Sequence, residues 1–167
     1  MSERPVTSVP VLKLEIASRP ELLSSVRSMV VSFGERAGLD EIESGHLALA
    51  VDEALANVIR HGYQGRQDGR IWLTLCSLDV PEPRIRIAIE DEGSQIDPEK
   101  IRPRDLDEVR PGGLGVHIIR EVTDHCEFSR REDVGMSLVM EKNLPARSRS
   151  HIPSIIPPSS DSPQDAP

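Results

Sequence analysis

The chain has 167 residues, which is about the size of one domain and enough to bury a core. Its 28 Asp and Glu against 20 Lys and Arg give a formal net charge of -8, which argues against a protein that binds nucleic-acid phosphates. Aromatic residues make up only 2%, so the stacking platforms of single-strand binders are missing and the core should be aliphatic.

The first half of the domain is predicted to form one strand and two helices. Residues 12–17 alternate apolar and polar side chains, which is the period of a half-buried strand. Ser18, followed by Pro and Glu, predicts the N-cap of a helix that ends at Gly38. Asp40 is predicted to cap a second helix in the same way, and this helix should run to about Arg60.

The second half is predicted to be richer in strands. Strands are expected at residues 71–78 and 84–90, a helix from Leu114, and a closing hairpin over residues 126–144. Residues 91–111 are charged and interrupted by Gly and Pro, so we expect a loop with at most one short helix. Hairpins without alternating βαβ units predict the α+β class, as a two-layer sandwich with helices on one face of a mixed or antiparallel sheet.

The ends of the chain, its cysteines and its apolar runs allow further predictions. The folded domain should span residues 9–144, with a flexible N-terminus at 1–8 and a disordered Pro- and Ser-rich tail at 145–167. Cys76 and Cys126 lie within or beside apolar runs and are expected to be buried thiols. Because neither a signal peptide nor an apolar run of membrane-spanning length is present, we expect a cytoplasmic protein with no membrane partner.

The second predicted helix has two distinct faces. One is a core stripe of Leu47, Val51, Ala54, Leu55 and Val58. The other is polar and carries His46, Glu53, Asn57 and Arg60. A polar stripe is most simply a solvated helix face. However, Glu53 and Asn57 lie one turn apart, so a carboxylate and a carboxamide are stacked side by side.

Two glycine-containing motifs accompany this helix. Asp91 and Gly93 follow a strand, where an acid can project into a pocket and glycine lets a flat ligand approach the backbone. The stretch "RPGGLGVHIIRE" sets three glycines before a helix, so backbone N–H groups and the positive helix end favour phosphate. The stretch is not a P-loop, because no Gly-Lys-Ser/Thr follows, and no strand leads into it as a dinucleotide fingerprint requires.

In this order, "EALAN", "DEG" and "GGLG" resemble the N, G1 and G2 boxes of the Bergerat-type (GHKL) ATPase superfamily. The longer stretches "ALAVDEALANVIRHGY", "IAIEDEG" and "GGLGVHIIREVTD" look like its anti-sigma-factor serine kinases, over roughly residues 10–143. The resemblance implies the Bergerat ATP-binding fold and a protein serine kinase that uses ATP and Mg²⁺. It also implies three partners, namely an anti-sigma-factor antagonist as substrate, a sigma factor, and a second copy of the chain in a homodimer.

The resemblance also implies roles for single residues. Glu53 would accept the proton of the attacking hydroxyl, Asn57 would ligate Mg²⁺, and Asp91 would accept the adenine amino group. The other implied nucleotide contacts are Gly93, Gly113, Leu114, Gly115, Val116 and Ser137. His61 and His117 are further candidates for phosphate contacts by position.

Gln95 departs from the superfamily pattern, because it stands where the G1 box usually has a second glycine. The serine-kinase branch tolerates this loss, so ATP binding is still expected along an altered loop, with residues 97–110 as a short ATP lid. One alternative is a non-catalytic ATP-binding module that sequesters a protein partner. A histidine kinase catalytic domain is disfavoured, because only about ten residues precede the first predicted strand.

Overall fold

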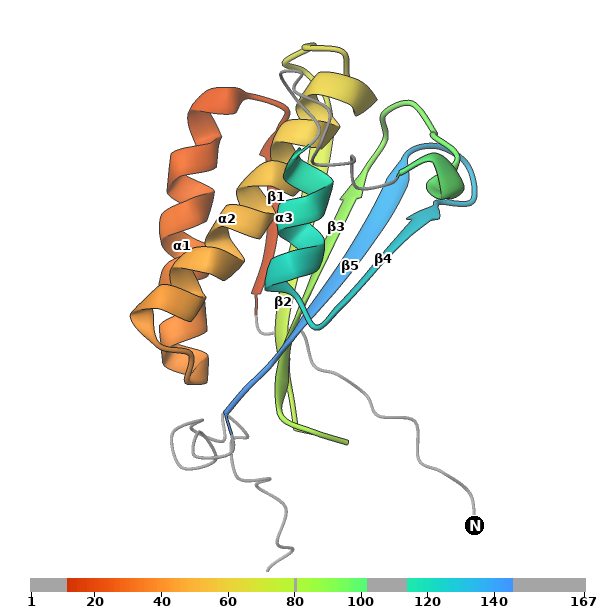
Figure 1. Cartoon of the computed structure of the whole chain (residues 1–167). Helices are drawn as coiled ribbons and strands as arrows, with labels where there is room; N and C mark the ends of the chain where they lie inside the picture. The colour runs from red at the N-terminus through yellow and green to blue at the C-terminus, as the bar shows by residue number, and fades with distance from the viewer. Residues whose placement is uncertain (1–11, 80, 102–113, 146–167) are drawn as a thin grey trace, which may run out of the picture.

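The protein was analysed as a computed structural model, which describes residues 12–79, 81–101 and 114–145. Figure 1 shows two layers, an antiparallel sheet and a set of helices that covers one of its faces. The predicted α+β two-layer sandwich is therefore confirmed. The predicted flexible N-terminus, the tail after Pro145 and most of the predicted lid lie outside the described residues.

The sheet has the strand order β1-β2-β3-β5-β4. Its strands are β1 (Leu12–Ala17), β2 (Arg70–Leu78), β3 (Arg84–Asp91), β4 (His125–Arg130) and β5 (Met136–Asn143). Every neighbouring pair is antiparallel, and β5 lies between β3 and β4. Alternate side chains point at the helices, and on β3 these are the fully buried Ile85, Ile87 and Ile89. This alternation decides which side chains can reach a site between the layers.

The helical layer has α2 at its centre, packed between α1 and α3 (Figure 1). The α-helices of the described residues are α1 (Leu23–Ala37), α2 (Glu41–Asn57) and α3 (Leu114–Val122). Short turns occur at η1 (Pro20–Leu22), η2 (Val58–Gly62) and η3 (Pro98–Lys100). In the predicted core stripe of α2 four side chains are buried, and Val58 is partly buried. None of these helices is long and apolar enough to span a membrane.

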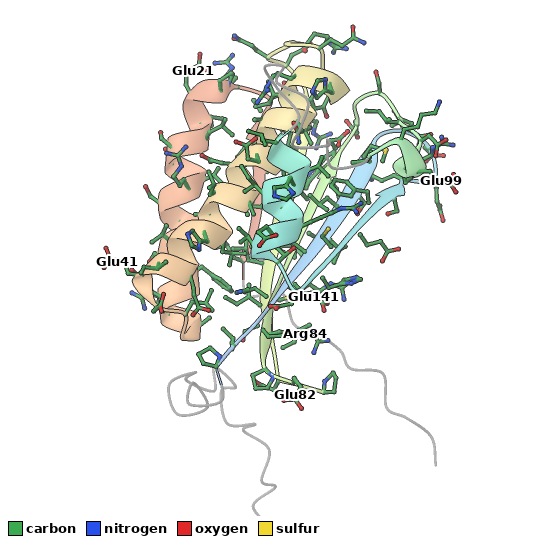
Figure 2. The ribbon with its side chains drawn as sticks, viewed as in Figure 1. Glu21, Glu41, Glu82, Arg84, Glu99 and Glu141 are labelled. Carbon is green, nitrogen blue, oxygen red and sulfur yellow. The ribbon has the colours of Figure 1, made fainter. Side chains whose placement is uncertain are left out.

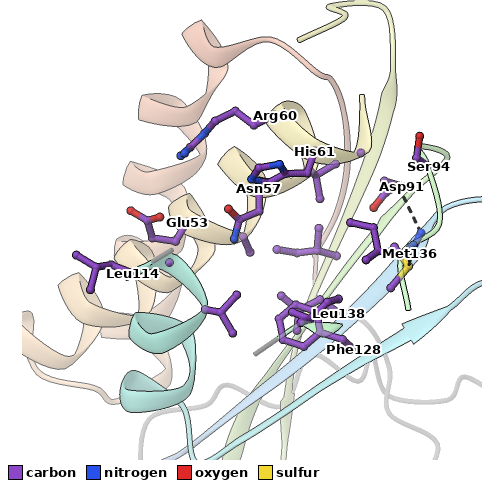
Figure 3. Close-up of a pocket in the computed structure, with 18 residues that line it drawn as sticks. Glu53, Asn57, Arg60, His61, Asp91, Ser94, Leu114, Phe128, Met136 and Leu138 are labelled. Carbon is purple, nitrogen blue, oxygen red and sulfur yellow. Dashed lines mark hydrogen bonds between the residues drawn. The ribbon is translucent and has the colours of Figure 1, made fainter. Parts of the chain in front are cut away.

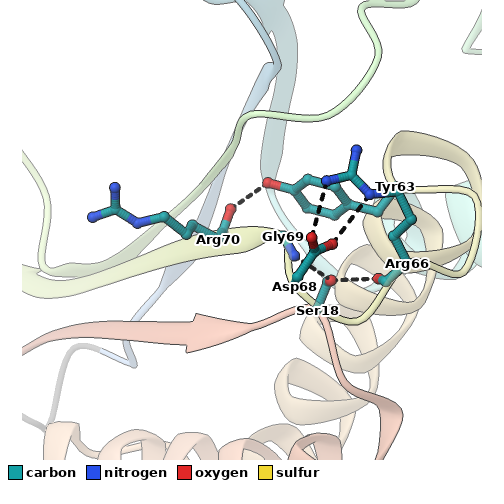
Figure 4. A network of polar contacts seen from close by, with 6 residues as sticks. All are labelled: Ser18, Tyr63, Arg66, Asp68, Gly69 and Arg70. Carbon is teal, nitrogen blue, oxygen red and sulfur yellow. Dashed lines mark hydrogen bonds and ion pairs between the residues drawn. The ribbon is translucent and has the colours of Figure 1, made fainter.

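One of the two predicted helix caps is confirmed and the other is wrong. Asp40 accepts a hydrogen bond from a backbone N–H in the first turn of α2 at 2.7 Å. Ser18 caps no helix, because its hydroxyl donates to the Arg66 carbonyl at 2.5 Å and accepts from the Gly69 N–H at 3.0 Å (Figure 4). Ser18 is fully buried, so its hydroxyl satisfies backbone groups of a distant loop instead of a local helix end.

Helix α2 continues past Asn57 as the π-helical turn η2, and Tyr63 anchors its end. The Tyr63 ring lies so close to Gly69 that a Cβ on this glycine would be 2.4 Å from a ring carbon. The Tyr63 hydroxyl accepts from the Glu92 N–H at 2.8 Å and donates to the Arg70 carbonyl (Figure 4). The end of α2 is thereby joined to β2 and to the loop after β3.

Polar side chains lie mostly on the outside of both layers. Figure 2 shows Glu21 and Glu41 pointing away from the helices, and Arg84 and Glu141 meeting on the sheet. Arg84 Nε lies 3.1 Å from Glu141 Oε2, across the register pairs that join β3 and β5. The two cysteines are free thiols, with Cys76 buried and the second one partly buried.

Candidate active site

A cavity of about 820 Å³ lies between the helical layer and strands β3, β4 and β5 (Figure 3). Small-molecule sites in proteins span about 300–1,000 Å³, so this cavity has room for a nucleotide-sized ligand. Most of its sheet side is apolar and includes Ile89, Phe128, Met136 and Leu138. Its polar lining includes Glu53, Asn57 and Asp91, so the structure brings these three predicted site residues together.

Helices α2 and α3 meet at one end of the cavity. Glu53 and Asn57 lie one turn apart on α2 and face the buried Gly115 in the first turn of α3 (Figure 3). A Cβ on Gly115 would lie 2.7 Å from Glu53 Oε2 and 3.2 Å from Asn57 Nδ2, so a side chain there would displace both groups. The first turn of α3, at the positive end of the helix, therefore lies beside the carboxylate and the carboxamide.

Asp91 closes the other end of the cavity and is only 2% exposed. Its Oδ1 accepts from the Gly93 N–H at 2.7 Å and from the Met136 N–H at 3.4 Å. Burial raises the pKa of Asp91, while these two donors and the charge of Arg131 partly oppose the rise. Both hydrogen bonds that the described residues make to this carboxylate are accepted by Oδ1. The second oxygen, Oδ2, can therefore accept a hydrogen bond from a ligand.

Two glycines fix the backbone around Asp91. A Cβ on Gly93 would lie 2.6 Å from the carbonyl carbon of Gly62, so these two chain segments cross in direct backbone contact. Gly135 has a φ of +83°, and a Cβ there would lie 1.8 Å from the main-chain oxygen of Asp91. Gly93 therefore packs behind Asp91 against Gly62, and it is not among the residues that line the cavity.

Of the other predicted nucleotide contacts, Leu114 and Val116 line the cavity beside Gly115, whereas Gly113 lies outside the described residues. Ser137 does not line the cavity. Since side chains alternate along β5, Met136 and Leu138 point into the cavity, and Ser137 lies on the opposite face of the sheet in register with Glu90.

Comparison with known proteins agrees with this geometry. The chain matches the model of the histidine kinase-like ATPase domain over residues 16–142. The protein belongs to this family. It is 30% identical over 141 residues to the serine-protein kinase RsbW of Listeria monocytogenes, covering 80% of this chain and 87% of that protein. It is 26% identical over 147 residues to the serine-protein kinase RsbW of Bacillus pumilus, covering 82% and 88%. The mycobacterial sensor histidine kinase MprB shows a weaker likeness, with 15% identity, 79% and 97% coverage and a TM-score of 0.46.

The π-helical turn of this histidine kinase-like ATPase domain adds a guanidinium group and an imidazole ring to the cavity wall. Arg60 and His61 both line the cavity, whereas His117 does not. His61 was a candidate by its position in the sequence, and Arg60 belonged to the predicted polar stripe. The apolar sheet side, with Phe128 and Met136, was not predicted, although the alternation of apolar residues in the last two strands is the signal that could have found it.

Gln95, the departure from the superfamily pattern, does not line the cavity of this ATPase domain. Its side-chain amide donates to the Arg131 carbonyl at 2.8 Å, and Arg130 Nε donates to the Ile96 carbonyl at 3.2 Å. Gln95 therefore joins the loop after β3 to the β4–β5 hairpin.

The cavity of this ATPase domain fits ATP in its arrangement of chemical groups. A buried acceptor carboxylate lies at one end, and apolar side chains that can cover a flat base lie beside it. At the other end a carboxamide oxygen can bind a hard cation such as Mg²⁺, next to the first turn of a helix.

Proposed function

We propose that the protein is a cytoplasmic serine kinase that transfers the γ-phosphoryl group of ATP to a protein, and that it acts as an anti-sigma factor in a partner-switching system. The observation that carries the proposal is the contact of Gly115 with both Glu53 and Asn57 at one end of a cavity whose other end holds Asp91. The relatives that bear the name serine-protein kinase RsbW support the choice of a serine kinase.

Asp91 would select adenine. Its buried carboxylate is an acceptor, so it pairs with the exocyclic amino group of adenine and opposes the carbonyl oxygen that guanine has at the equivalent position. Ile89, Met136 and Leu138 would cover the faces of the base. With the base bound at Asp91, the phosphates would lie at the other end of the cavity, which Glu53 and Asn57 form.

Glu53 would accept the proton of the serine hydroxyl. As the bond between the serine oxygen and the γ-phosphorus forms, the bond to the bridging oxygen of ADP breaks, and the hydroxyl proton passes to the Glu53 carboxylate. Asn57 would hold Mg²⁺ through its side-chain oxygen, and the metal would supply neutralisation of the phosphate charge. Phosphoryl transfer mainly needs alignment, and two groups one turn apart on a rigid helix provide it.

The substrate would be an anti-sigma-factor antagonist with a phosphorylatable serine, and the second partner would be a sigma factor. The motif resemblance to anti-sigma-factor serine kinases supports both assignments, and it also supports a homodimer. Light scattering at micromolar concentration is expected to give twice the 18.5 kDa mass of one chain. A monomer mass under these conditions would remove the homodimer from the proposal.

Calorimetric titration with ATP and GTP, with and without Mg²⁺, tests the proposal. Wild-type protein is expected to bind ATP more tightly than GTP and to bind ATP more tightly with Mg²⁺ than without. Asn57→Ala should keep the fold and the Mg²⁺-free affinity, and should lose the gain that Mg²⁺ gives. Absence of ATP binding in both buffers would overturn the proposal, whereas ATP binding without transfer to any protein would favour the non-catalytic module.

A further inference from the structure

Asp91 is held by a side chain that does not belong to the cavity. Arg131 follows β4 directly, and its Nη1 donates to the main-chain oxygen of Asp91 at 2.7 Å. Its Nε also lies 3.7 Å from Glu90 Oε1, although Arg131 is absent from the cavity lining. The contact joins residues 40 positions apart in the sequence, and it acts on the peptide group that follows the Asp91 Cα.

Arg131 is in turn fixed from three directions. Its guanidinium carbon lies 5.2 Å from the centroid of the Trp72 ring on β2, within the roughly 6 Å of a cation–π contact. Its carbonyl accepts from the Gln95 side chain at 2.8 Å, and its N–H donates to the Gly135 carbonyl at 3.2 Å. With these contacts the guanidinium cannot swing away from Asp91 without breaking a stacking contact.

We propose that Arg131 is a positioning residue that fixes the direction of the Asp91 carboxylate and so sets the preference for adenine over guanine, an inference that rests on the proposed function. A hydrogen bond to the main-chain oxygen fixes the peptide plane that follows the Asp91 Cα and so holds the Cα from which the side chain extends, while the Gly93 and Met136 N–H groups hold its Oδ1. A group that reads one amino group must be held to within about 0.5 Å, and supporting contacts of this kind provide that accuracy.

The charge of Arg131 has a second effect on the same carboxylate. Burial raises the pKa of Asp91, and the positive charge of Arg131 lowers it. Removal of Arg131 should therefore raise the pKa of Asp91 further, so the acceptor form would be lost at a higher pH. Two other contacts of Asp91, to the Gly93 and Met136 N–H groups, would remain in place.

Arg70 is a matched control for Arg131. Its guanidinium carbon lies 5.0 Å from the centroid of the same Trp72 ring, so it makes a comparable cation–π contact. Its charged nitrogens bind the Glu15 carboxylate, at 2.9 and 3.2 Å, and not Asp91. Replacing Arg70 removes one arginine from the same ring without touching the peptide group of Asp91.

The experiment compares Arg131→Ala and Arg70→Ala with wild type by calorimetry, using ATP and GTP as separate ligands over a range of pH. Arg131→Ala should weaken ATP binding about tenfold and lower the ATP-to-GTP affinity ratio by a similar factor, and the low-pH loss of ATP binding should move to higher pH. Arg70→Ala should change both quantities less than about twofold. Thermal unfolding checks that both variants are folded.

The inference is overturned if wild type binds ATP selectively and Arg131→Ala and Arg70→Ala show the same affinity ratio and pH profile. Failure of wild type to bind either nucleotide would instead overturn the proposed function. If Arg131→Ala does not fold, Arg131→Gln replaces it, since it keeps an N–H donor on a shorter side chain while losing the charge. The low-pH limit of ATP binding should then still move upward, and an unmoved limit would contradict the inference.

Discussion

The two ends of the cavity are formed by different kinds of groups. At the Asp91 end, buried backbone segments touch directly, with Gly93 against Gly62 and Gly135 against Asp91. At the other end, the described residues give the side chain of neither Glu53 nor Asn57 a hydrogen-bond partner, and both groups are partly exposed on a helix surface. The proposed base end, at Asp91, is therefore part of the fold, whereas the proposed phosphate end, at Glu53 and Asn57, presents chemical groups that can meet a ligand.

Substitutions at the two ends should therefore have different effects. A change at the base end alters close backbone packing or a buried charge, and so it should change stability together with binding. A change at the phosphate end removes a partly exposed functional group, and so it should change chemistry while leaving the fold intact. Four substitutions test this contrast.

The largest effect is expected for Glu53→Gln at the phosphate end. Without a carboxylate to accept the serine proton, transfer should fall by roughly 10²–10⁴-fold, while ATP affinity and thermal stability stay near wild type. The measurement is labelling of protein serine by γ-labelled ATP in an extract of the source organism. Glu41 lies at the exposed start of the same helix, so Glu41→Gln serves as a control and should leave the labelling unchanged. A large loss of stability in Glu53→Gln would contradict the contrast.

The next effect is a loss of stability at the base end. Gly135→Ala should lower the free energy of unfolding by roughly 3 kcal/mol or more, because its Cβ would overlap the main-chain oxygen of Asp91 and its φ is positive. Gly65→Ala is the matched control, since Gly65 has nearly the same φ but nothing within 4 Å of its Cβ, and it should cost about 1 kcal/mol. Urea unfolding measures both, and equal losses would show that the contact with Asp91 has no energetic weight.

Asp91→Asn should impair nucleotide binding but increase the stability of the fold. Because the pKa of Asp91 is raised in the folded state, ionisation at neutral pH destabilises the fold, and the neutral amide should remove this penalty. The variant should therefore unfold at a higher temperature than wild type at pH 8, with the difference fading as the pH falls toward the ordinary pKa of 3.8. ATP selectivity should be lost. A variant that is less stable than wild type at pH 8 would contradict the predicted increase in stability.

The smallest effect is expected for Arg60→Gln on the π-helical turn. Arg60 is exposed at the cavity wall, so its attraction for ATP phosphates is screened by water and salt. ATP affinity should fall about twofold at low salt and should match wild type at about 1 M salt. Calorimetry at two salt concentrations measures this. A loss that persists at high salt would indicate a direct contact with the nucleotide.

Most of the fold could be predicted because its signals are local. Alternation marks the strands, and Asp40 caps α2 through a bond within its own first turn. Ser18 has the same local pattern, but its hydroxyl bonds a loop about 50 residues away, which no local pattern shows. Ser137 was assigned by motif position, yet the two-residue period of β5 turns it to the other face.

The site, like the fold, could be predicted where its signals are local and not where they depend on long-range contacts. Glu53 and Asn57 could be paired from helical spacing, and their meeting with Asp91 followed from motif order. The contact of Arg131 with Asp91 depends on how a hairpin lies against a loop, so it could not be seen in the sequence. The same holds for the buried Asp52, which pairs with Arg27 on the neighbouring helix.

The crossing of Gly62 and Gly93 gives the molecule an internal reporter. The Ser94 N–H donates to the Gly62 carbonyl at 2.9 Å, so one amide joins the loop after β3 to the end of the helix that carries Glu53. Separation of the helix end at Gly62 from the loop after β3 must expose this amide to solvent. Its exchange rate with deuterium therefore measures how often the site opens, and a ligand that bridges both ends should slow that exchange.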